Sequence, residues 1–468
     1  MRSLKTAIFL SLILGIGCDG NNPPPTDAGG DTDAGAMGTD AGMMMTDSAM
    51  PPTGDGNDSF ADADPITLGP DGTMARIATP GDRDYYTFEG TAGTWMILST
   101  EANPDDDSTM IDTVITLFDS SMTMIAENDD SVPRVSTDSE IITRLPADGT
   151  YYVLVQEFSQ WNGDTPEGEN TANFDYTLAV AELNLMAAAI NVDGETGDDL
   201  ASAESIGYNA GSAADFGVIV GDFRDGSDVD VYSFTVSDTR VSSRFLMMPT
   251  GADGYGSTTS IGRMWITNSD GSQIIARVTI DESDTADITS IWPPLPAGDY
   301  HLFVENGGAP GANGFYVLKT WLFNEDNPPE DPATDDANDM PAGAQALTLE
   351  ADMTDATIRR GYILALLADG DTDHFSFDVM GTEQVNVFCR SSTSGSGVLG
   401  LSAAVLDSTG AMELRRANET ATAGIAIEDL AVSGPGTYLL RIAKTGQSPE
   451  VTGAWVRCAI ALAPPAAP

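Results

Sequence analysis

Histidine, lysine and arginine are scarce in this chain of 468 residues. It holds 2 histidines and 20 lysine and arginine residues against 72 aspartate and glutamate residues, which gives a formal net charge of −52. Recognition of nucleic acid or of an anionic membrane surface requires clustered basic side chains. We therefore expect no nucleic-acid partner, whereas divalent cations, basic proteins and neutral polymers stay open as ligands.

The shortage of histidine also limits the catalytic chemistry. His301 and His374 lie in separate parts of the chain, each within a strand-like stretch. The sequence contains no HExxH zinc motif, no GxSxG nucleophile elbow and no cysteine–histidine pairing. We therefore predict that the protein is not an enzyme, and a hydrolase of an unrecognised kind is the alternative.

Residues 1–17 are typical of an export signal. Arg2 and Lys5 precede a short apolar core, which is too short to span a membrane, and small residues lead up to Cys18. The end of this segment, Gly-Ile-Gly-Cys, resembles the lipobox of bacterial lipoproteins, in which the cysteine is acylated. This resemblance implies lipidation at Cys18 and a protein anchored in the bacterial cell envelope, at the outer membrane or cell surface. An ordinary signal peptide followed by an unmodified cysteine is the alternative.

The segment after Cys18 lacks the residues that build a core. Between Asp19 and Ser59 there is no valine, isoleucine, leucine or aromatic residue, and no lysine or arginine. A segment with so little apolar surface to bury cannot offset the entropy lost on folding. The sequence therefore predicts that residues 18–54 form a disordered acidic linker between the lipid anchor and the folded part.

Beyond this linker three landmarks recur in a fixed order. An acidic segment contains Asp58, Asp199 or Asp339, and a turn that leads into a strand closes each repeat. Between them lies an Asp-x-Asp strand, which reads GDRDYYTF at 81–88, SDVDVYSF at 227–234 and GDTDHFSF at 370–377. The repeats are as long as whole domains and far longer than solenoid repeats. They predict three domains, at 55–185, 196–323 and 336–463, separated by acidic linkers at 187–199 and 324–339.

Within each repeat the hydrophobic pattern is that of β-strands. Short runs such as TVITLF, YYVLV and VYSFTV are rich in β-branched and aromatic residues, and clusters of glycine, asparagine, aspartate and proline separate them. No long helical pattern competes with these runs. The predicted fold class is all-β, with three tandem antiparallel, jelly-roll-like β-sandwiches of about eight strands each.

The first repeat closely resembles the bacterial pre-peptidase C-terminal domain, a β-sandwich often appended to secreted proteases. The resemblance rests on NDS at 57–59, GDRDYYTFEGTAG at 81–93, DTVITLFDSSMTMIAENDDS at 112–131, LPADGTYYVLVQEF at 145–158 and FDYTLAV at 174–180. The other two repeats keep the Asp-x-Asp pattern but lack the Asn-Asp-Asp element. The resemblance implies a module that is generally non-catalytic, and relatives in secreted collagenases bind collagen and calcium.

Two carboxylates at the start of each Asp-x-Asp strand need an explanation. Asp82 and Asp84 have the same parity as Tyr86 and Phe88, so they point toward the inner rim of the sandwich if the aromatic rings face the core. Neighbouring buried carboxylates are costly unless something compensates them. Backbone amides of a turn or a calcium ion could do so, and both alternatives stay open. A catalytic dyad would need functional partners that no repeat contains.

For the first repeat the resemblance implies a set of calcium ligands. This set consists of Asp55, Asn57, Asp58, Asp82 and Asp84. It differs from an EF-hand, whose loop needs a glycine at its sixth position and a closing glutamate. Calcium is the one cofactor that we expect from the sequence.

The remaining cysteines, Cys389 and Cys458, both lie in strand-like stretches of the third repeat. Each has the same parity as apolar neighbours, so both side chains should face one core. In an oxidising export compartment we expect a disulfide, with two buried free thiols as the alternative. A zinc site is disfavoured because no third and fourth ligands are at hand.

Together these features predict a non-catalytic lipoprotein of the cell envelope that presents binding or adhesion modules. The expected partners are the membrane, through the lipid anchor, and an extracellular protein or polysaccharide. Two alternatives stay open. The protein could be an accessory or targeting component of a secreted protease system, or a spacer that calcium makes rigid.

Overall fold

The computed structural model describes most of the chain beyond the acidic linker. The described ranges are 56–79, 81–102, 111–131, 137–163, 174–193, 197–211, 214–237, 241–248, 250–259, 261–279, 289–324, 337–351, 357–367, 370–420 and 424–465. Cys18, the linker at 18–54 and Asp55 lie outside these ranges, as does most of the linker at 324–339. No helix in the described ranges is long and apolar enough to cross a membrane.

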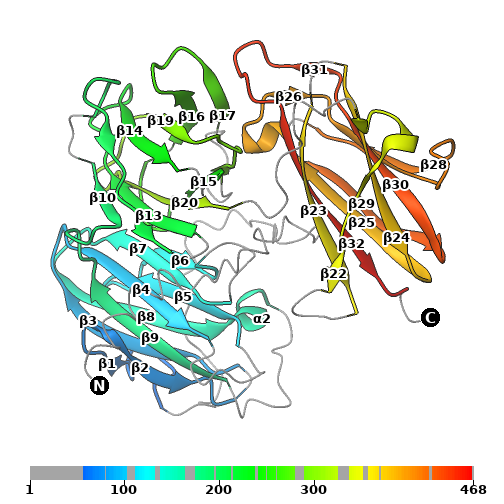
Figure 1. The fold of residues 1–468 in the computed structure, drawn as a ribbon. Coiled ribbons are helices and arrows are strands. Elements are labelled where there is room, and N and C mark those ends of the chain that lie inside the picture. Colours follow the sequence, from blue (N-terminus) through cyan, green and yellow to red (C-terminus); the bar gives the residue numbers. More distant parts are fainter. Residues whose placement is uncertain are drawn as a thin grey trace.

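The predicted all-β fold class with three tandem β-sandwiches is confirmed. Two larger sheets form each domain, and the helical elements are short: α2 (Phe158–Trp161), η3 (Pro341–Gly343) and η4 (Ser392–Ser394). Figure 1 shows the first domain in blue to blue-green, the second in green and the third in yellow to red.

The first domain contains sheets with the strand orders β1-β3-β8-β5-β6 and β2-β9-β4-β7. The strands are β1 (Asp64–Pro65), β2 (Gly69–Arg76), β3 (Asp84–Gly90), β4 (Trp95–Glu101), β5 (Thr113–Phe118), β6 (Met124–Asn128), β7 (Glu140–Arg144), β8 (Gly149–Glu157) and β9 (Asp175–Glu182).

The second domain contains the sheets β11-β14-β19-β16-β17 and β10-β13-β20-β15-β18, with β12 paired to β13. The strands are β10 (Ile190–Val192), β11 (Glu204–Ser205), β12 (Asn209–Ala210), β13 (Ala214–Gly221), β14 (Val229–Val236), β15 (Ser242–Met247), β16 (Ile261–Asn268), β17 (Ile274–Thr279), β18 (Thr289–Ile291), β19 (Gly298–Asn306) and β20 (Tyr316–Phe323). Strand β10 comes from the segment expected to be a linker between the first two repeats.

The third domain contains the sheets β21-β24-β30-β27-β28 and β22-β23-β32-β25-β29, together with a small pair, β26-β31. The strands are β21 (Gln345–Ala346), β22 (Glu350–Ala351), β23 (Arg359–Leu366), β24 (Thr372–Val379), β25 (Thr382–Arg390), β26 (Val398–Leu399), β27 (Ser402–Leu406), β28 (Glu413–Asn418), β29 (Ile425–Ser433), β30 (Gly436–Ala443), β31 (Gly446–Gln447) and β32 (Trp455–Ala463).

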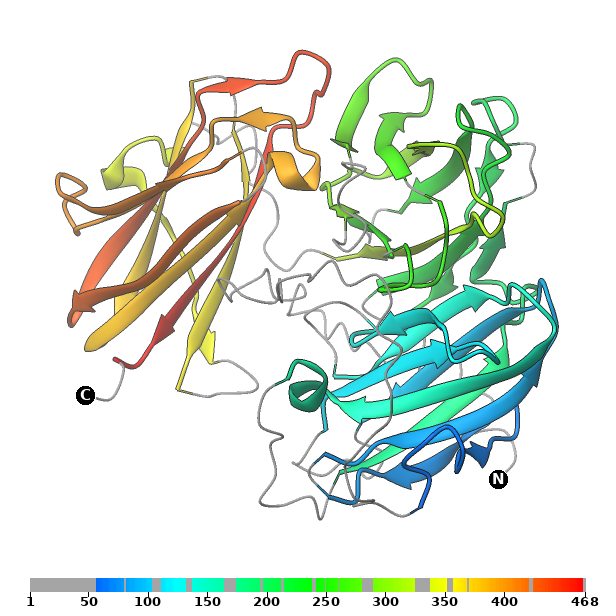
Figure 2. The ribbon, with the colours of Figure 1, turned by 180° about the vertical axis from the view of Figure 1, so that it is seen from behind.

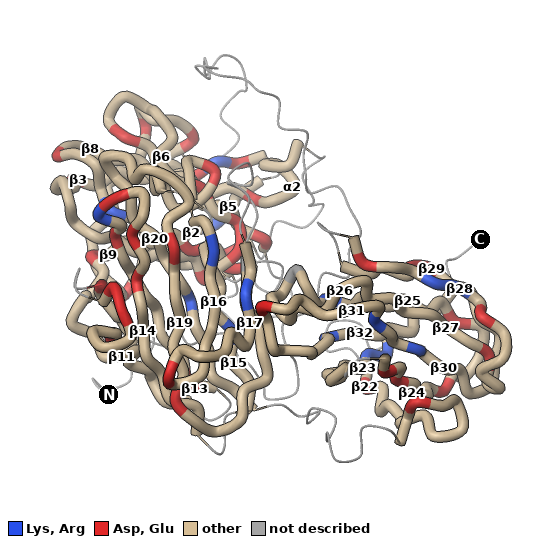
Figure 3. The backbone as a smooth tube through the Cα atoms, turned by 90° about the horizontal axis from the view of Figure 1, so that it is seen from above, with Lys and Arg blue, Asp and Glu red and all other residues tan. Residues whose placement is uncertain are grey.

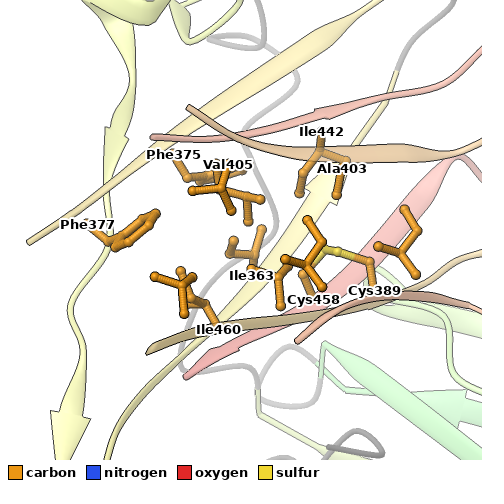
Figure 4. Close-up of a cluster of buried hydrophobic side chains, with 14 of the residues drawn as sticks. Ile363, Phe375, Phe377, Cys389, Ala403, Val405, Ile442, Cys458 and Ile460 are labelled. Carbon is orange, nitrogen blue, oxygen red and sulfur yellow. A yellow bond between two sulfur atoms is a disulfide. The ribbon is translucent and has the colours of Figure 1, made fainter. Parts of the chain in front are cut away.

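Each sandwich has its own apolar core, built from alternate residues of its strands. In the third domain Phe375 and Phe377 of β24 face the core, as their parity predicts (Figure 4). Cys389 and Cys458 lie directly opposite each other on β25 and β32 and are joined in a disulfide that points into this core.

A further apolar core joins the first two domains. The outer face of the sheet β2-β9-β4-β7 packs on the outer face of the sheet that contains β13 and β20. The contact includes Ile97 and Ile142 from the first domain and Val218, Phe315 and Trp321 from the second. At the edge of this contact Lys319 of β20 forms an ion pair with Glu140 of β7, and the Nζ–Oε1 distance is 2.7 Å. The first two domains therefore form one packed unit rather than two domains without a shared core (Figure 2).

The third domain meets the second along a hydrogen-bonded seam. The backbone N–H groups of Thr452 and Gly453 donate to the carbonyl groups of Ile274 and Ile275 on β17, at 2.8 and 3.0 Å. A Cβ atom at Gly453 would lie 2.3 Å from the Ile275 carbonyl oxygen, so this close approach requires glycine. Arg457 adds a hydrogen bond from its Nε to the carbonyl of Trp292, at 2.9 Å.

Candidate metal centre

The three Asp-x-Asp strands occupy equivalent places. Asp84, Asp230 and Asp373 begin or nearly begin β3, β14 and β24, opposite strands β8, β19 and β30. The acidic segment of each repeat lies alongside and is tied to this strand by backbone hydrogen bonds, in which Asn57, Gly197 and Asn338 supply the accepting carbonyls. Each repeat therefore brings an acidic segment next to its Asp-x-Asp pair.

These backbone bonds correct one assignment in the second repeat. Gly197 is equivalent to Asn57 and Asn338. The aspartate of the second repeat that is equivalent to Asp58 and Asp339 is therefore Asp198, not Asp199. The carboxylate of Asp199 is exposed and accepts hydrogen bonds from the backbone N–H groups of its own turn. The prediction that aligned Asp199 was wrong by one residue because sequence spacing alone cannot fix the register of a short turn.

In the first domain the buried pair is held by protein groups. Asp82 and Asp84 are both fully buried. The carboxylate of Asp82 accepts hydrogen bonds from the backbone N–H groups of Ala78, at 2.6 Å, and Arg83, at 3.0 Å. The hydroxyl of Tyr176 donates to Asp84. Backbone amides of a turn and a tyrosine hydroxyl thus donate hydrogen bonds to the two buried carboxylates of the first domain.

Two other acidic groups come close enough together to hold a metal ion. Among the described residues, Asp198, Asp228 and Asp230 form one such group, and Asp339, Asp371 and Asp373 form the other. In each group the candidate ligand atoms all lie within 4.8 Å of one another. Both groups are at positions equivalent to the calcium set expected in the first repeat, but in the second and third domains.

In the second domain an arginine enters the group. The Nη2 atom of Arg224 contacts carboxylate oxygens of both Asp198 and Asp228, and its distance to Asp228 Oδ1 is 3.0 Å. The hydroxyl of Tyr316 donates to Asp230 Oδ2 at 2.6 Å. Burial, with the nearby charges of Asp193 and Asp228, raises the pKa of Asp230 to about 8 despite this hydrogen bond. The second domain therefore compensates its carboxylates with a guanidinium, a tyrosine and a retained proton.

The third domain uses neither the tyrosine nor the arginine. Phe375 stands where the first two domains have a tyrosine on the Asp-x-Asp strand. Val456 of β32 takes the core position that Tyr316 has on β20. The carboxylate of Asp371 accepts the backbone N–H of Thr372 at 2.6 Å, and Asp373 is fully buried.

Next to this group lies a buried amide that the sequence analysis did not single out. Asn338 is 3% exposed, and neither its Oδ1 nor its Nδ2 has a hydrogen-bond partner among the described residues. The Oδ1 atom of Asp339 is likewise buried without such a partner. Burying an amide or carboxylate oxygen in this way costs free energy. Calcium binds to carboxylate and amide oxygens. Among the described residues, the donor set of the third domain therefore fits that ion better than those of the other two domains.

A separate cluster of acidic residues in the first domain was also missed. Asp112 precedes β5, and burial, together with the charges of Asp129 and Glu157, raises the pKa of Asp112 to about 7. Asp129 belongs to the Asn-Asp-Asp element that distinguishes the first repeat. The sequence signal for this cluster was present in DTVITLF and ENDDS, but their proximity depends on the pairing of β5 with β6.

Asp112 should make stability depend on pH. Its pKa is higher in the folded than in the unfolded chain, so its ionisation destabilises the fold as pH rises from about 4 to about 7. Asp112→Asn should remove this loss and raise the free energy of unfolding at pH 8. The gain should be at most about 4 kcal/mol, because partial exposure to solvent screens the carboxylate. Urea unfolding of both proteins at pH 5 and pH 8 tests this. An equal stability difference at the two pH values would contradict it.

The two histidines are not brought together. His301 lies on β19 of the second domain, and His374 lies on β24 of the third. Burial lowers the pKa of His374, whose Nδ1 lies 3.1 Å from the carbonyl oxygen of Asn338. Acidic residues occur on loops of all three domains (Figure 3), but no histidine accompanies them in either of the two candidate metal groups among the described residues.

Comparison with known proteins agrees with the resemblance seen in the sequence. Residues 82–157 match the bacterial pre-peptidase C-terminal domain. A protein of Deinococcus radiodurans named "Probable subtilase-type serine protease" is 32% identical over 134 residues. This match covers 28% of the present chain and only 18% of the Deinococcus protein. The first domain thus matches a non-catalytic type of module that is associated with secreted proteases.

Solved structures also resemble parts of the chain. The pre-peptidase C-terminal domain of collagenase from Bacillus anthracis matches with 20% identity and a TM-score of 0.18, covering 25% of this chain and 93% of that domain. The tandem CBM51 modules of the family 98 glycoside hydrolase from Streptococcus pneumoniae SP3-BS71 match with 8% identity and a TM-score of 0.18, covering 54% of this chain and 84% of theirs.

Proposed function

We propose that the protein is a non-catalytic lipoprotein of the bacterial cell envelope that presents its three β-sandwiches as binding or adhesion modules. The observation that carries this proposal is a match to the pre-peptidase C-terminal domain in a chain whose two histidines lie in different domains. The ligand is an extracellular protein or polysaccharide. The strongly acidic composition disfavours nucleic acid.

The test is capture of a partner by the full protein. Purified protein is immobilised through its N-terminus and exposed to envelope extract and to purified polysaccharides, with an equally acidic unrelated protein as control. Saturable retention of one partner, at a salt concentration that screens non-specific charge effects, supports the proposal. If the protein retains no partner from the envelope extract and none of the polysaccharides, the proposal is contradicted.

The lipid anchor rests on Cys18 and is tested separately. In a bacterial host fed a labelled fatty acid, the wild-type protein should carry the label and sediment with membranes. Cys18→Ser should lose both properties, because the residue that accepts the acyl chains is gone. A labelled, membrane-bound Cys18→Ser protein would contradict the assignment.

An accessory role in a secreted protease system is the second candidate. The observation that favours it is the similarity of 134 residues to the subtilase-type protein of Deinococcus radiodurans. In this role the modules would bring a separate protease to its substrate. Purified protein should then leave casein and gelatin intact by itself but accelerate their cleavage by a co-secreted protease. Cleavage by the purified protein alone would contradict both candidates.

We also place a calcium ion in the third domain. Asp339, Asp371 and Asp373, with Asn338 beside them, would hold it. The ion would neutralise the buried carboxylates and tie the acidic segment at the start of the domain to strand β24. Its role would be structural, since Asp373 and Asn338 are buried.

Calcium should therefore raise the melting temperature of the third domain. In isothermal titration the wild-type protein should bind about one calcium ion, and Asp371→Asn with Asp373→Asn should abolish this binding. Asp407→Asn is a suitable control, since Asp407 is half-buried and its carboxylate is occupied within its own turn. Identical melting curves in calcium and in chelator would remove calcium from the proposal.

A further inference from the structure

The second domain carries a positive charge where the third domain would carry calcium. We propose that Arg224 is a built-in cation that replaces a divalent ion in the second domain, so that this domain needs no metal. The inference rests on the calcium site proposed for the third domain only for its comparison between domains. All the contacts of Arg224 on which it depends lie within the second domain.

The position of the guanidinium supports this role. Nη2 of Arg224 contacts a carboxylate oxygen of Asp198, which comes from the acidic segment, and one of Asp228, which comes from the loop before β14. A metal ion that joined the same two segments would lie between the same oxygens, since these belong to a group within 4.8 Å of one another. The nitrogen atom and a divalent cation cannot occupy that space together.

The backbone of Arg224 makes the same hydrogen bond as the backbone of Ala78 in the first domain. The N–H of Arg224 donates to Asp228 Oδ2 at 2.6 Å, and the N–H of Ala78 donates to Asp82 Oδ2 at the same distance in the first domain. The two domains thus share this hydrogen bond, and arginine in the second domain stands where the first has alanine. In the third repeat the residue after the core residue Leu367 is again alanine in the sequence. Only the second repeat has a cation at this position.

The chemistry of the two cations differs in one useful respect. A guanidinium stays protonated at all physiological pH values and is covalently attached, so it cannot dissociate. A calcium ion leaves when its concentration falls below its dissociation constant. The arginine would keep the second domain, and the core it shares with the first, folded in calcium-poor surroundings, while the third domain would respond to calcium.

The test is to remove the arginine and ask whether calcium takes its place. Purified full-length protein, wild type and Arg224→Ala, is titrated with calcium chloride by isothermal titration calorimetry. The variant should bind one more calcium ion per chain than the wild type. Adding Asp228→Asn to the variant should remove this extra ion. Arg263→Ala is the matched control, because Arg263 is also about 43% exposed and ion-paired, with Glu305; it should bind no additional calcium.

Thermal unfolding keeps the test decisive if the variant is unstable. Arg224→Ala should melt lower than the wild type in chelator and recover most of the difference in millimolar calcium, whereas Arg224→Lys should need no calcium. An Arg224→Ala protein that gains neither a binding site nor calcium-dependent stability would overturn the proposal. So would a wild-type protein whose binding of calcium is abolished by Asp228→Asn.

The same titrations separate this inference from the calcium site of the third domain. In a protein that carries Asp371→Asn and Asp373→Asn, Arg224→Ala should still gain one calcium ion. If the wild type binds no calcium and Arg224→Ala binds one, the third-domain site is refuted and the role of Arg224 stands. If the wild type binds one ion and Arg224→Ala also binds one, the reverse holds.

Discussion

Replacing Lys319 by methionine is expected to lower the free energy of unfolding by about 3–5 kcal/mol. The lysine and its partner Glu140 are almost wholly buried between the first two domains, with side-chain exposures of 3% and 4%. Nζ also donates to the carbonyl of Ser131, so the lysine satisfies two acceptors of the first domain. Methionine fills a similar volume but leaves a carboxylate buried without its cation. Urea unfolding at pH 7 measures the loss.

A double variant separates the charge from the packing. Lys319→Met combined with Glu140→Gln removes both charges, and a buried neutral pair costs less than a single buried ion. The double variant should therefore recover a large part of the stability lost by Lys319→Met alone. If the double variant is as unstable as the sum of the two single variants, the ion pair is not the source of the effect.

Removing the disulfide between Cys389 and Cys458 is expected to destabilise the third domain by about 4 kcal/mol. The bond closes a loop with a sequence separation of 69 residues, so its loss restores much conformational freedom to the unfolded chain. Both cysteines are buried, with exposures of 1% and 2%, and alanine at the two positions also leaves a small cavity in the core. Chemical unfolding of the Cys389→Ala, Cys458→Ala protein tests this.

The effect should be confined to one part of the molecule. The first and second domains share a core with each other but not with the cysteines, so their unfolding should change little. Hydrogen exchange read out by peptide would show faster exchange in the strands of residues 359–463 and unchanged exchange in β4, β7 and β13. Faster exchange throughout the chain would contradict a local role of the bond.

The Asp-x-Asp strands illustrate what could be predicted from the sequence. Alternation along an extended chain places Asp84 on the same side as Tyr86 and Phe88, and the structure buries all three. The same rule predicted one shared core for Cys389 and Cys458, which the structure joins. Such local rules suffice where the periodicity of a single strand decides the outcome.

The compensation of the carboxylates could not be predicted in this way. It depends on Tyr176 and Tyr316, which are far from the Asp-x-Asp strands in sequence, and on Arg224, whose side chain reaches two segments. Sequence resemblance implied calcium ligands in the first repeat, whereas the two groups of three aspartates close enough to hold a metal ion, among the described residues, lie in the other two domains. The bridging residues belong to different strands, and only the fold brings them together.

The contact between the first two domains left a signal in the sequence that was not used. Strand β20 reads YVLKTWLF and is apolar at positions of both parities, so both of its faces are buried, one in its own sandwich and one against the first domain. A strand with one solvent-exposed face would alternate instead. The single lysine in this run, Lys319, is the residue that pairs across the contact.

The core shared by the first two domains fixes the distance between any two ligand sites that lie one on each of them. A flexible linker would let such sites adjust to many targets, with an effective concentration set by the length of the linker. Two sites on a rigid pair instead gain avidity only from targets whose own repeat matches their separation. This pair of domains would therefore select a regular polymer outside the cell by the distance between its repeating units as well as by its chemistry.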